Sequence, residues 1–205
     1  MRDLELRGAG DLLGSEQSGH VAAVGFELYV EMLDAAVAEL RASREGEEER
    51  TEEEVRVDTD VSAFVPSTYV PYEAAKIDIH RRIAGAHAPG ELRALRDELR
   101  DRFGPPPEPV EALLAVQRAR IELAREGASS LSLRGGRIQA QPLDFESDRV
   151  ARLRKRIPEA IFSSREGTLT LRVAGSEAPD AERIAALDTL TDAVSQSRDS
   201  AAAAA

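Results

Sequence analysis

The stretch Leu131-Ser-Leu-Arg-Gly-Gly-Arg-Ile-Gln-Ala140 indicates the fold most directly, because it has the pattern of a β-hairpin. Leu131-Ser-Leu133 and Ile138-Gln-Ala140 alternate apolar and polar side chains, which is the period of a strand with one buried face. Gly135 and Gly136 lie between them and can adopt the positive φ that a tight turn requires. The sequence therefore predicts a small antiparallel sheet in this region.

Two neighbouring stretches extend the predicted sheet. Ala160-Ile-Phe162 and Thr168-Leu-Thr-Leu-Arg-Val173 flank Arg-Glu-Gly, which indicates a second hairpin. Further towards the N-terminus, Glu54-Val-Arg-Val-Asp-Thr-Asp-Val61 alternates in the same way and predicts another strand.

Outside these strands, the apolar residues recur with the period of an α-helix. Residues 89–103 carry Leu92, Leu95, Leu99 and Phe103 on one face, and Gly104-Pro-Pro-Pro107 ends this stretch sharply. The predicted helices run over about residues 72–83, 89–103, 108–125 and 148–157, and a last one carries Ile184, Leu187, Leu190 and Val194. Residues 57–195 are therefore expected to form a compact, helix-rich α+β domain with a small antiparallel sheet.

The N-terminal part has a different character. Residues 1–45 are expected to form a loop followed by a long helix, whose apolar stripe runs from about His20 to Leu40. Residues 41–56 hold seven Glu and four Arg, so we place an acidic linker at 46–56. Residues 196–205, Ser-rich and then Ala, are expected to be a disordered tail.

Composition limits the classes of function. The net charge of −11 argues against a chain that binds nucleic acid over its whole surface, so any DNA contact is expected to be local. The chain has no cysteine, which fits a reducing cytoplasm and excludes a thiolate metal site. Apolar runs are too short for a membrane span, so no membrane partner is expected.

Four glycines, Gly8, Gly10, Gly14 and Gly19, lie among charged residues near the N-terminus. Their spacing differs from a dinucleotide fingerprint, and a phosphate-loop motif ending in Gly-Lys-Ser/Thr is missing from the sequence. We therefore expect no cofactor site in this chain.

Catalytic and metal sites are not expected either. His80 and His87 are seven positions apart without cysteine partners, and His80 is expected on a solvated helix surface. The sequence contains no Gly-x-Ser-x-Gly nucleophile elbow.

Arg7 and Gln17 are polar residues inside the glycine-rich loop, and spacing leaves their role open. In one interpretation Arg7 caps a helix C-terminus and Gln17 binds a backbone carbonyl within an ordered turn. In the other interpretation they hold the loop to another element, since guanidinium and amide groups can join separate segments.

Residues 2–29 closely resemble one region of the bacterial transcription-repair coupling factors. The resemblance continues in Val65-Pro-Ser-Thr-Tyr69, Tyr72, Ile79-His-Arg-Arg-Ile83 and Glu98-Leu-Arg-Asp-Arg-Phe-Gly-Pro-Pro-Pro107, which are similar to the family's C-terminal regulatory domain. It implies that residues 1–45 form the translocation motif and that residues 57–195 form the regulatory domain.

The resemblance also implies a mechanism for the parent protein. Such a protein uses ATP and magnesium to translocate on duplex DNA, displaces stalled RNA polymerase and recruits nucleotide excision repair. Arg7 and Gln17, with the four glycines around them, match the residues that couple ATP hydrolysis to translocation. The regulatory domain docks on an N-terminal repair-protein-like module of the same protein and keeps it autoinhibited.

This chain lacks the motor motifs, so by itself it is expected to be inactive as an ATP hydrolase and translocase. The charged faces around Arg93–Arg102 or the basic helix Arg149–Arg156 are the candidate docking surfaces. Two alternatives stay open: a standalone adaptor that carries a relic translocation loop, and an unrelated small enzyme.

Overall fold

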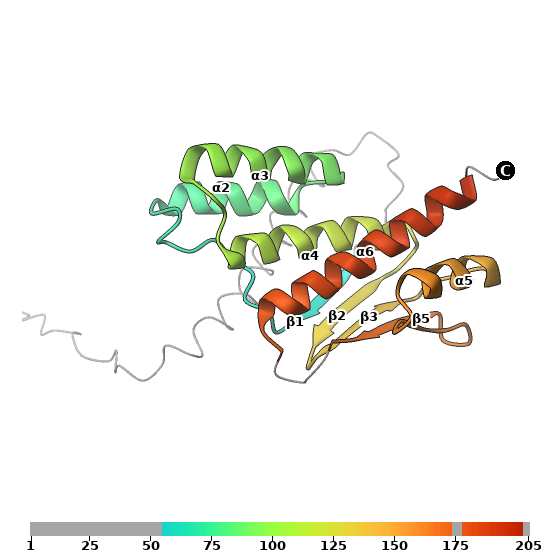
Figure 1. The fold of residues 1–205 in the computed structure, drawn as a ribbon. Helices are drawn as coiled ribbons and strands as arrows, with labels where there is room; N and C mark the ends of the chain where they lie inside the picture. The colour runs from blue at the N-terminus through green and yellow to red at the C-terminus, as the bar shows by residue number, and fades with distance from the viewer. Residues whose placement is uncertain (1–54, 174–177, 203–205) are drawn as a thin grey trace, which may run out of the picture. The chain divides into compact units, whose positions relative to one another are not determined.

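The computed structural model describes residues 55–173 and 178–202 (Figure 1). The predicted loop and long helix of residues 1–45 lie outside these residues, as does most of the acidic linker. The elements follow one another as β1 (Arg56–Thr59), α2 (Glu73–Ala84), α3 (Pro89–Phe103), α4 (Glu108–Ala124), β2 (Ser130–Arg134), β3 (Arg137–Gln141), α5 (Ser147–Arg156), β4 (Ile161–Ser163), β5 (Thr168–Arg172) and α6 (Asp180–Ala202). The predicted α+β class is thereby confirmed.

Both predicted hairpins form and lie in one sheet with the strand order β1-β2-β3-β5-β4. β2 pairs antiparallel with β3, and β4 pairs antiparallel with β5. The turn between β2 and β3 has positive φ at Gly135 (54°) and Gly136 (69°), as the sequence predicts.

The sheet is mixed, which corrects the expectation of an antiparallel sheet. β1 runs parallel to β2, with Val57 opposite Leu131 and Thr59 opposite Leu133. A parallel pair needs a long crossover connection, and α2, α3 and α4 supply it here. Alternation predicts that residues 56–59 form a strand, but it carries no information on the direction of pairing.

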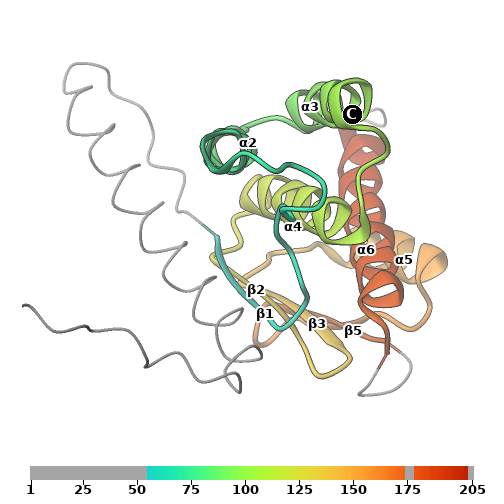
Figure 2. The ribbon, with the colours of Figure 1, turned by 90° about the vertical axis from the view of Figure 1, so that its left-hand side faces the viewer.

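Two helices cover one face of the sheet. Figures 1 and 2 show α4 and α6 side by side over the strands. The side chains buried between sheet and helices include Leu131, Leu133, Ile138, Ala140, Leu169 and Leu171 from the strands and Leu187, Leu190 and Val194 from α6. These strand residues occupy alternate positions, so the sheet presents its other side chains on the opposite face.

A second apolar cluster joins α2, α3 and α4. Its members include Ile79 and Ile83 from α2, Leu92, Leu95 and Leu99 from α3, and Val110, Leu114 and Ile121 from α4. Gln117 of α4 is 9% exposed and donates from Nε2 to the carbonyl oxygens of Ala84 and Ala86, each at 3.2 Å. The helix α4 therefore lies between the two clusters and contributes to both.

The helix α6 is longer than the sequence suggests. It continues to Ala202, so residues 196–202, expected in a disordered tail, are helical, and only 203–205 lie outside the described residues. Ser197 is 1% exposed, and its hydroxyl donates to the Val194 carbonyl oxygen at 2.7 Å. The helix persists because its last turns pack on α4 and α5.

Candidate protein-docking surfaces

The residues expected to couple ATP hydrolysis to translocation are Arg7, Gln17, Gly8, Gly10, Gly14 and Gly19. All of them lie outside the described residues. The expected docking surfaces on α3 and α5 fall within the described part, so the contacts of their side chains are known.

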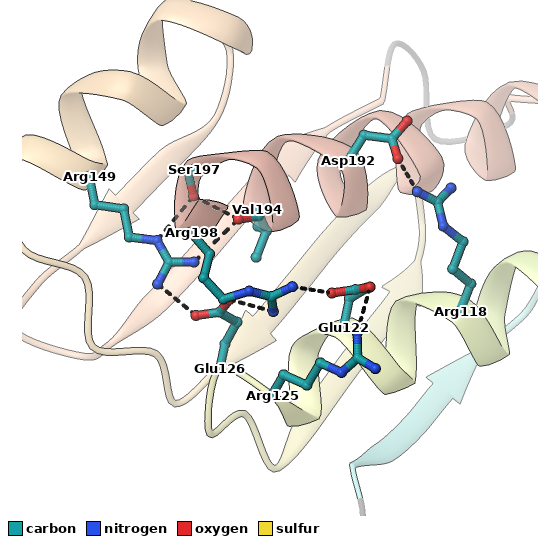
Figure 3. Close-up of polar contacts among 9 residues, drawn as sticks. All are labelled: Arg118, Glu122, Arg125, Glu126, Arg149, Asp192, Val194, Ser197 and Arg198. Atoms are coloured by element: carbon teal, nitrogen blue, oxygen red, sulfur yellow. Dashed lines mark hydrogen bonds and ion pairs between the residues drawn. The ribbon is translucent and has the colours of Figure 1, made fainter. Parts of the chain in front are cut away.

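The first basic residue of α5 is part of the internal structure of the domain. Arg149 donates from Nη1 to Oε2 of Glu126 at 2.6 Å, from Nε to Oγ of Ser197 at 3.0 Å and from Nη2 to the Val194 carbonyl at 3.2 Å (Figure 3). Its guanidinium also lies 4.2 Å from the centre of the Phe145 ring. Since its side chain is 14% exposed, Arg149 joins α5 to α4 and α6 and has little surface for a partner.

The same cluster continues along α4 and α6. Arg198 donates to Oε1 of Glu126 at 3.3 Å and to Oε2 of Glu122 at 3.1 Å, while Arg125 donates to Oε1 of Glu122 at 3.1 Å (Figure 3). The glutamate side chains are only 7% and 5% exposed, so each buried carboxylate is matched by two guanidinium groups. We call Glu122, Arg125, Glu126, Arg149 and Arg198 the carboxylate cluster.

The carboxylate cluster was not predicted from the sequence. One signal was available: Glu122 and Glu126 are four residues apart and therefore lie on the same face of α4. Their arginine partners Arg149 and Arg198 come from distant positions, and only the packing of α5 and α6 brings them together.

The outer side of α5 remains available for contact. Arg154 and Lys155 are exposed, whereas Arg152 is half-buried and donates to the Ser197 carbonyl at 3.5 Å. The exposed residue Arg156 donates to the side-chain oxygen of Gln196. The predicted surface Arg149–Arg156 is thus reduced to its last turn.

The exposed face of α3 carries a denser set of charges. Glu98 accepts two hydrogen bonds from Arg82, at 2.9 and 2.5 Å, and one from Arg102 at 2.9 Å. These hydrogen bonds lower the pKa of Glu98 to about 2, so it is ionised at neutral pH. An open hollow lies beside it, lined by Arg82, Gly85, Glu91, Ala94, Leu95 and Glu98.

Other α3 charges differ in how far they are already paired. Arg96 makes a two-pronged contact with Glu111 of α4, at 2.7 to 2.9 Å, which fixes α3 on α4. Arg93 and Asp101 are exposed, and neither forms an ion pair with another described residue. Together with Glu98 and Arg102 they form what we call the α3 surface.

His80 does not lie on a solvated helix surface, which differs from the sequence expectation. It is half-buried, and its Nε2 accepts a hydrogen bond from the Val65 N–H at 3.4 Å. Burial, followed by the charge of Lys76, lowers the pKa of His80 to about 4.

The described residues lack the features of two other kinds of site. Within residues 55–173 and 178–202, histidine and carboxylate side chains do not gather in groups of three or more that could hold a metal ion. None of the helices in that part combines the length and apolar character that a bilayer crossing requires.

The fold and the α3 surface define a small α+β domain that presents arginine and carboxylate side chains on its outer helices. Residues 59–153 match the TRCF domain family. The chain therefore carries the TRCF domain of the transcription-repair coupling factors, which confirms the resemblance found in the sequence.

Individual relatives agree with this assignment. The transcription-repair-coupling factor of Mycobacterium bovis is 34% identical over 205 residues, which are 95% of this chain and 17% of the relative. That of Escherichia coli K12 is 39% identical over 140 residues, 67% of this chain and 12% of the relative. The chain thus spans about a sixth of the length of the first relative and about an eighth of the second.

A solved structure shares the fold. The crystal structure of the C-terminal domain of a transcription-repair coupling factor superposes with a TM-score of 0.62 at 21% identity. The match covers 74% of this chain and 98% of the solved chain.

Proposed function

We propose that this chain works as the C-terminal part of a transcription-repair coupling factor that translocates on duplex DNA, displaces stalled RNA polymerase and recruits nucleotide excision repair in the cytoplasm. The TRCF domain match over residues 59–153 carries the proposal. ATP and magnesium would be bound by motor domains of the intact protein, because this chain has no phosphate-loop motif.

Within such a protein, the described domain would act by docking on a repair-protein-like N-terminal module and keeping it autoinhibited. The geometry favours the α3 surface over α5 as the docking site. Glu98, Arg102, Arg93 and Asp101 offer charges of both signs at the surface, which suits a protein partner better than a polyanion. Arg149 of α5, by contrast, is engaged inside the domain.

A pull-down with the repair-like module tests this docking. Reversing two charges that make no ion pair with described residues, in Arg93→Glu/Asp101→Arg, should reduce the module retained by the intact chain about tenfold or more, because rim charges set partner choice. The matched variant Arg154→Glu/Lys155→Glu, on α5, should retain it. Loss only in the α5 variant would move the site to α5, and equal retention by both variants would contradict docking through either helix.

The coupling role of residues 1–45 is a separate proposal. It rests on the match of Arg7, Gln17 and the glycines Gly8, Gly10, Gly14 and Gly19 to the family's translocation motif. In the intact protein, Arg7→Ala or Gln17→Ala should leave ATP hydrolysis near its normal rate and reduce translocation along DNA. Equal loss of both activities would instead indicate a defect in folding or in the nucleotide site.

A further inference from the structure

The face of the sheet that turns away from α4 and α6 is mainly polar, with Ile161 of β4 as an exposed apolar side chain at its edge. Side chains alternate along the strands, so the residues next to the buried leucines in sequence point to this opposite face. No described helix covers it, as Figures 1 and 2 show for the coloured elements. We call this surface the open face.

One cross-strand row of the open face consists of three arginines. Arg134 of β2 lies directly opposite Arg137 of β3, and Arg137 lies directly opposite Arg172 of β5. All three side chains are exposed. Like charges directly opposite each other on neighbouring strands destabilise a sheet, so this arginine row opposes folding unless something neutralises it.

The carboxylates near the arginine row are already engaged. Asp58 of β1 accepts a hydrogen bond from Nε of Arg134 at 2.6 Å. Asp60 forms an ion pair with Arg183 and accepts the Gly135 N–H at 3.3 Å. Arg137 and Arg172 form no ion pair with any residue in the described part of the chain, so their charge is available to a partner.

The rest of the open face suits hydrogen bonding to a backbone. The row next to the arginines runs from Asp58 through Ser132, Gln139 and Thr170 to the exposed Ile161, and its three central residues are half-buried and uncharged. The described strands place no aromatic side chain on this face, since Phe162 of β4 lies on the buried side. Single-stranded nucleic acid is bound largely by stacking of bases on aromatic rings, so this face fits a duplex better than a single strand.

We propose that the arginine row binds the phosphodiester backbone of duplex DNA. The outer two of three neighbouring strands lie roughly 10 Å apart, which is about the axial rise over four successive phosphates of one DNA strand. Guanidinium groups match phosphate oxygens in a two-pronged geometry. The net charge of −11 does not prevent a local contact, because charges beyond a Debye length of about 8–10 Å are largely screened.

This contact lies on a different surface from the proposed docking site on α3, and it does not depend on that docking. It would be weak and independent of base sequence, since only phosphates are contacted. In the proposed translocase, this contact would hold the domain against the duplex along which the motor of the same protein translocates.

The test is fluorescence anisotropy of a short labelled DNA duplex titrated with the full chain at several salt concentrations. Each phosphate contact contributes about −0.9 to the slope of log affinity against log salt. Arg137→Gln/Arg172→Gln should therefore make the slope about 2 units less steep and weaken binding about tenfold at low salt. The control Arg81→Gln/Arg154→Gln removes the same charge from exposed positions on α2 and α5 and should bind as the parent chain does.

Several outcomes would overturn the proposal. They are an absence of duplex binding by the parent chain at low salt, an unchanged slope in Arg137→Gln/Arg172→Gln, and an equal loss in both variants. Stronger binding of poly-glutamate than of the duplex would assign the row to an acidic peptide instead. Unfolding curves of both variants exclude misfolding as the cause of any loss.

Discussion

At the scale of single residues, Gly167 holds a turn that other residues would strain. Its φ is +59°, and an added Cβ would lie 2.9 Å from the Leu143 carbonyl oxygen. Gly167→Ala combines left-handed strain with a backbone clash, so we expect it to reduce the free energy of unfolding by about 3 kcal/mol. Gly127→Ala is the matched control, because its φ is +78° but no atom lies within 4 Å of the added Cβ. It should cost about 1 kcal/mol. Equal losses for both variants in urea unfolding would show that the clash contributes nothing.

His80 makes stability depend on pH below neutrality. Its pKa in the folded chain is about 4, below the ordinary 6.5, so the unfolded chain binds a proton that the folded chain does not. The stabilising effect is complete above pH 6.5 and is lost as the pH falls towards 4. Between pH 6.5 and pH 4, the free energy of unfolding of the parent chain should fall by about 2 kcal/mol more than that of His80→Gln. The exposed His87, changed to Gln, serves as the control. Parallel curves for the parent chain and His80→Gln would refute the expectation.

Residue patterns in the sequence predict inward-facing leucines and turn glycines correctly. Leu92, Leu95 and Leu99 are all buried, because a 3.6-residue period allows only one apolar face on α3. The environment of His80 could not be predicted in this way. Its partner, the Val65 N–H, comes from the loop between β1 and α2, whose path depends on tertiary packing.

At the scale of elements, Arg149 fixes α5 to α4 and α6. Arg149→Met keeps much of the side-chain length but leaves the nearly buried Glu126 with Arg198 alone. We expect a loss of about 3 kcal/mol in the free energy of unfolding, because breaking a buried ion pair leaves an under-compensated charge. Arg154→Met, also on α5 but exposed, should change stability by less than about 0.5 kcal/mol. Similar denaturation midpoints for the two variants would mean that the carboxylate cluster does not hold α5.

Helix and strand positions are also predictable at this scale, whereas their partners are not. The alternating pattern predicts β1 as a strand but does not show its direction of pairing. Three helices lie between β1 and β2, and such a long connection is typical of a parallel crossover. The predicted C-terminal end of α6 was wrong for a similar reason. Its serines and alanines lack an apolar stripe, and the contacts of Ser197 and Arg198 with distant residues hold the helix in place.

At the scale of the whole described domain, α4 connects the two apolar clusters. Ala112, Ala115 and Ala119 face the sheet and α6, while Val110 and Leu114 face α2 and α3. Leu113 contacts both clusters. Neither cluster can lose α4 without exposing part of the other, so the domain should unfold as one cooperative unit.

Native-state hydrogen exchange can test this cooperativity. Leu99 of α3 and Leu187 of α6 lie in different clusters and are 1% and 0% exposed. The backbone amides around both residues should exchange with the same free energy of opening, equal to that of global unfolding. Leu99→Ala should lower both values together by about 3 kcal/mol, and Leu187→Ala should do the same, because the cavity in one cluster destabilises the shared unit. If Leu99→Ala lowers the opening free energy of α2 and α3 only, these helices unfold separately from the sheet and α6.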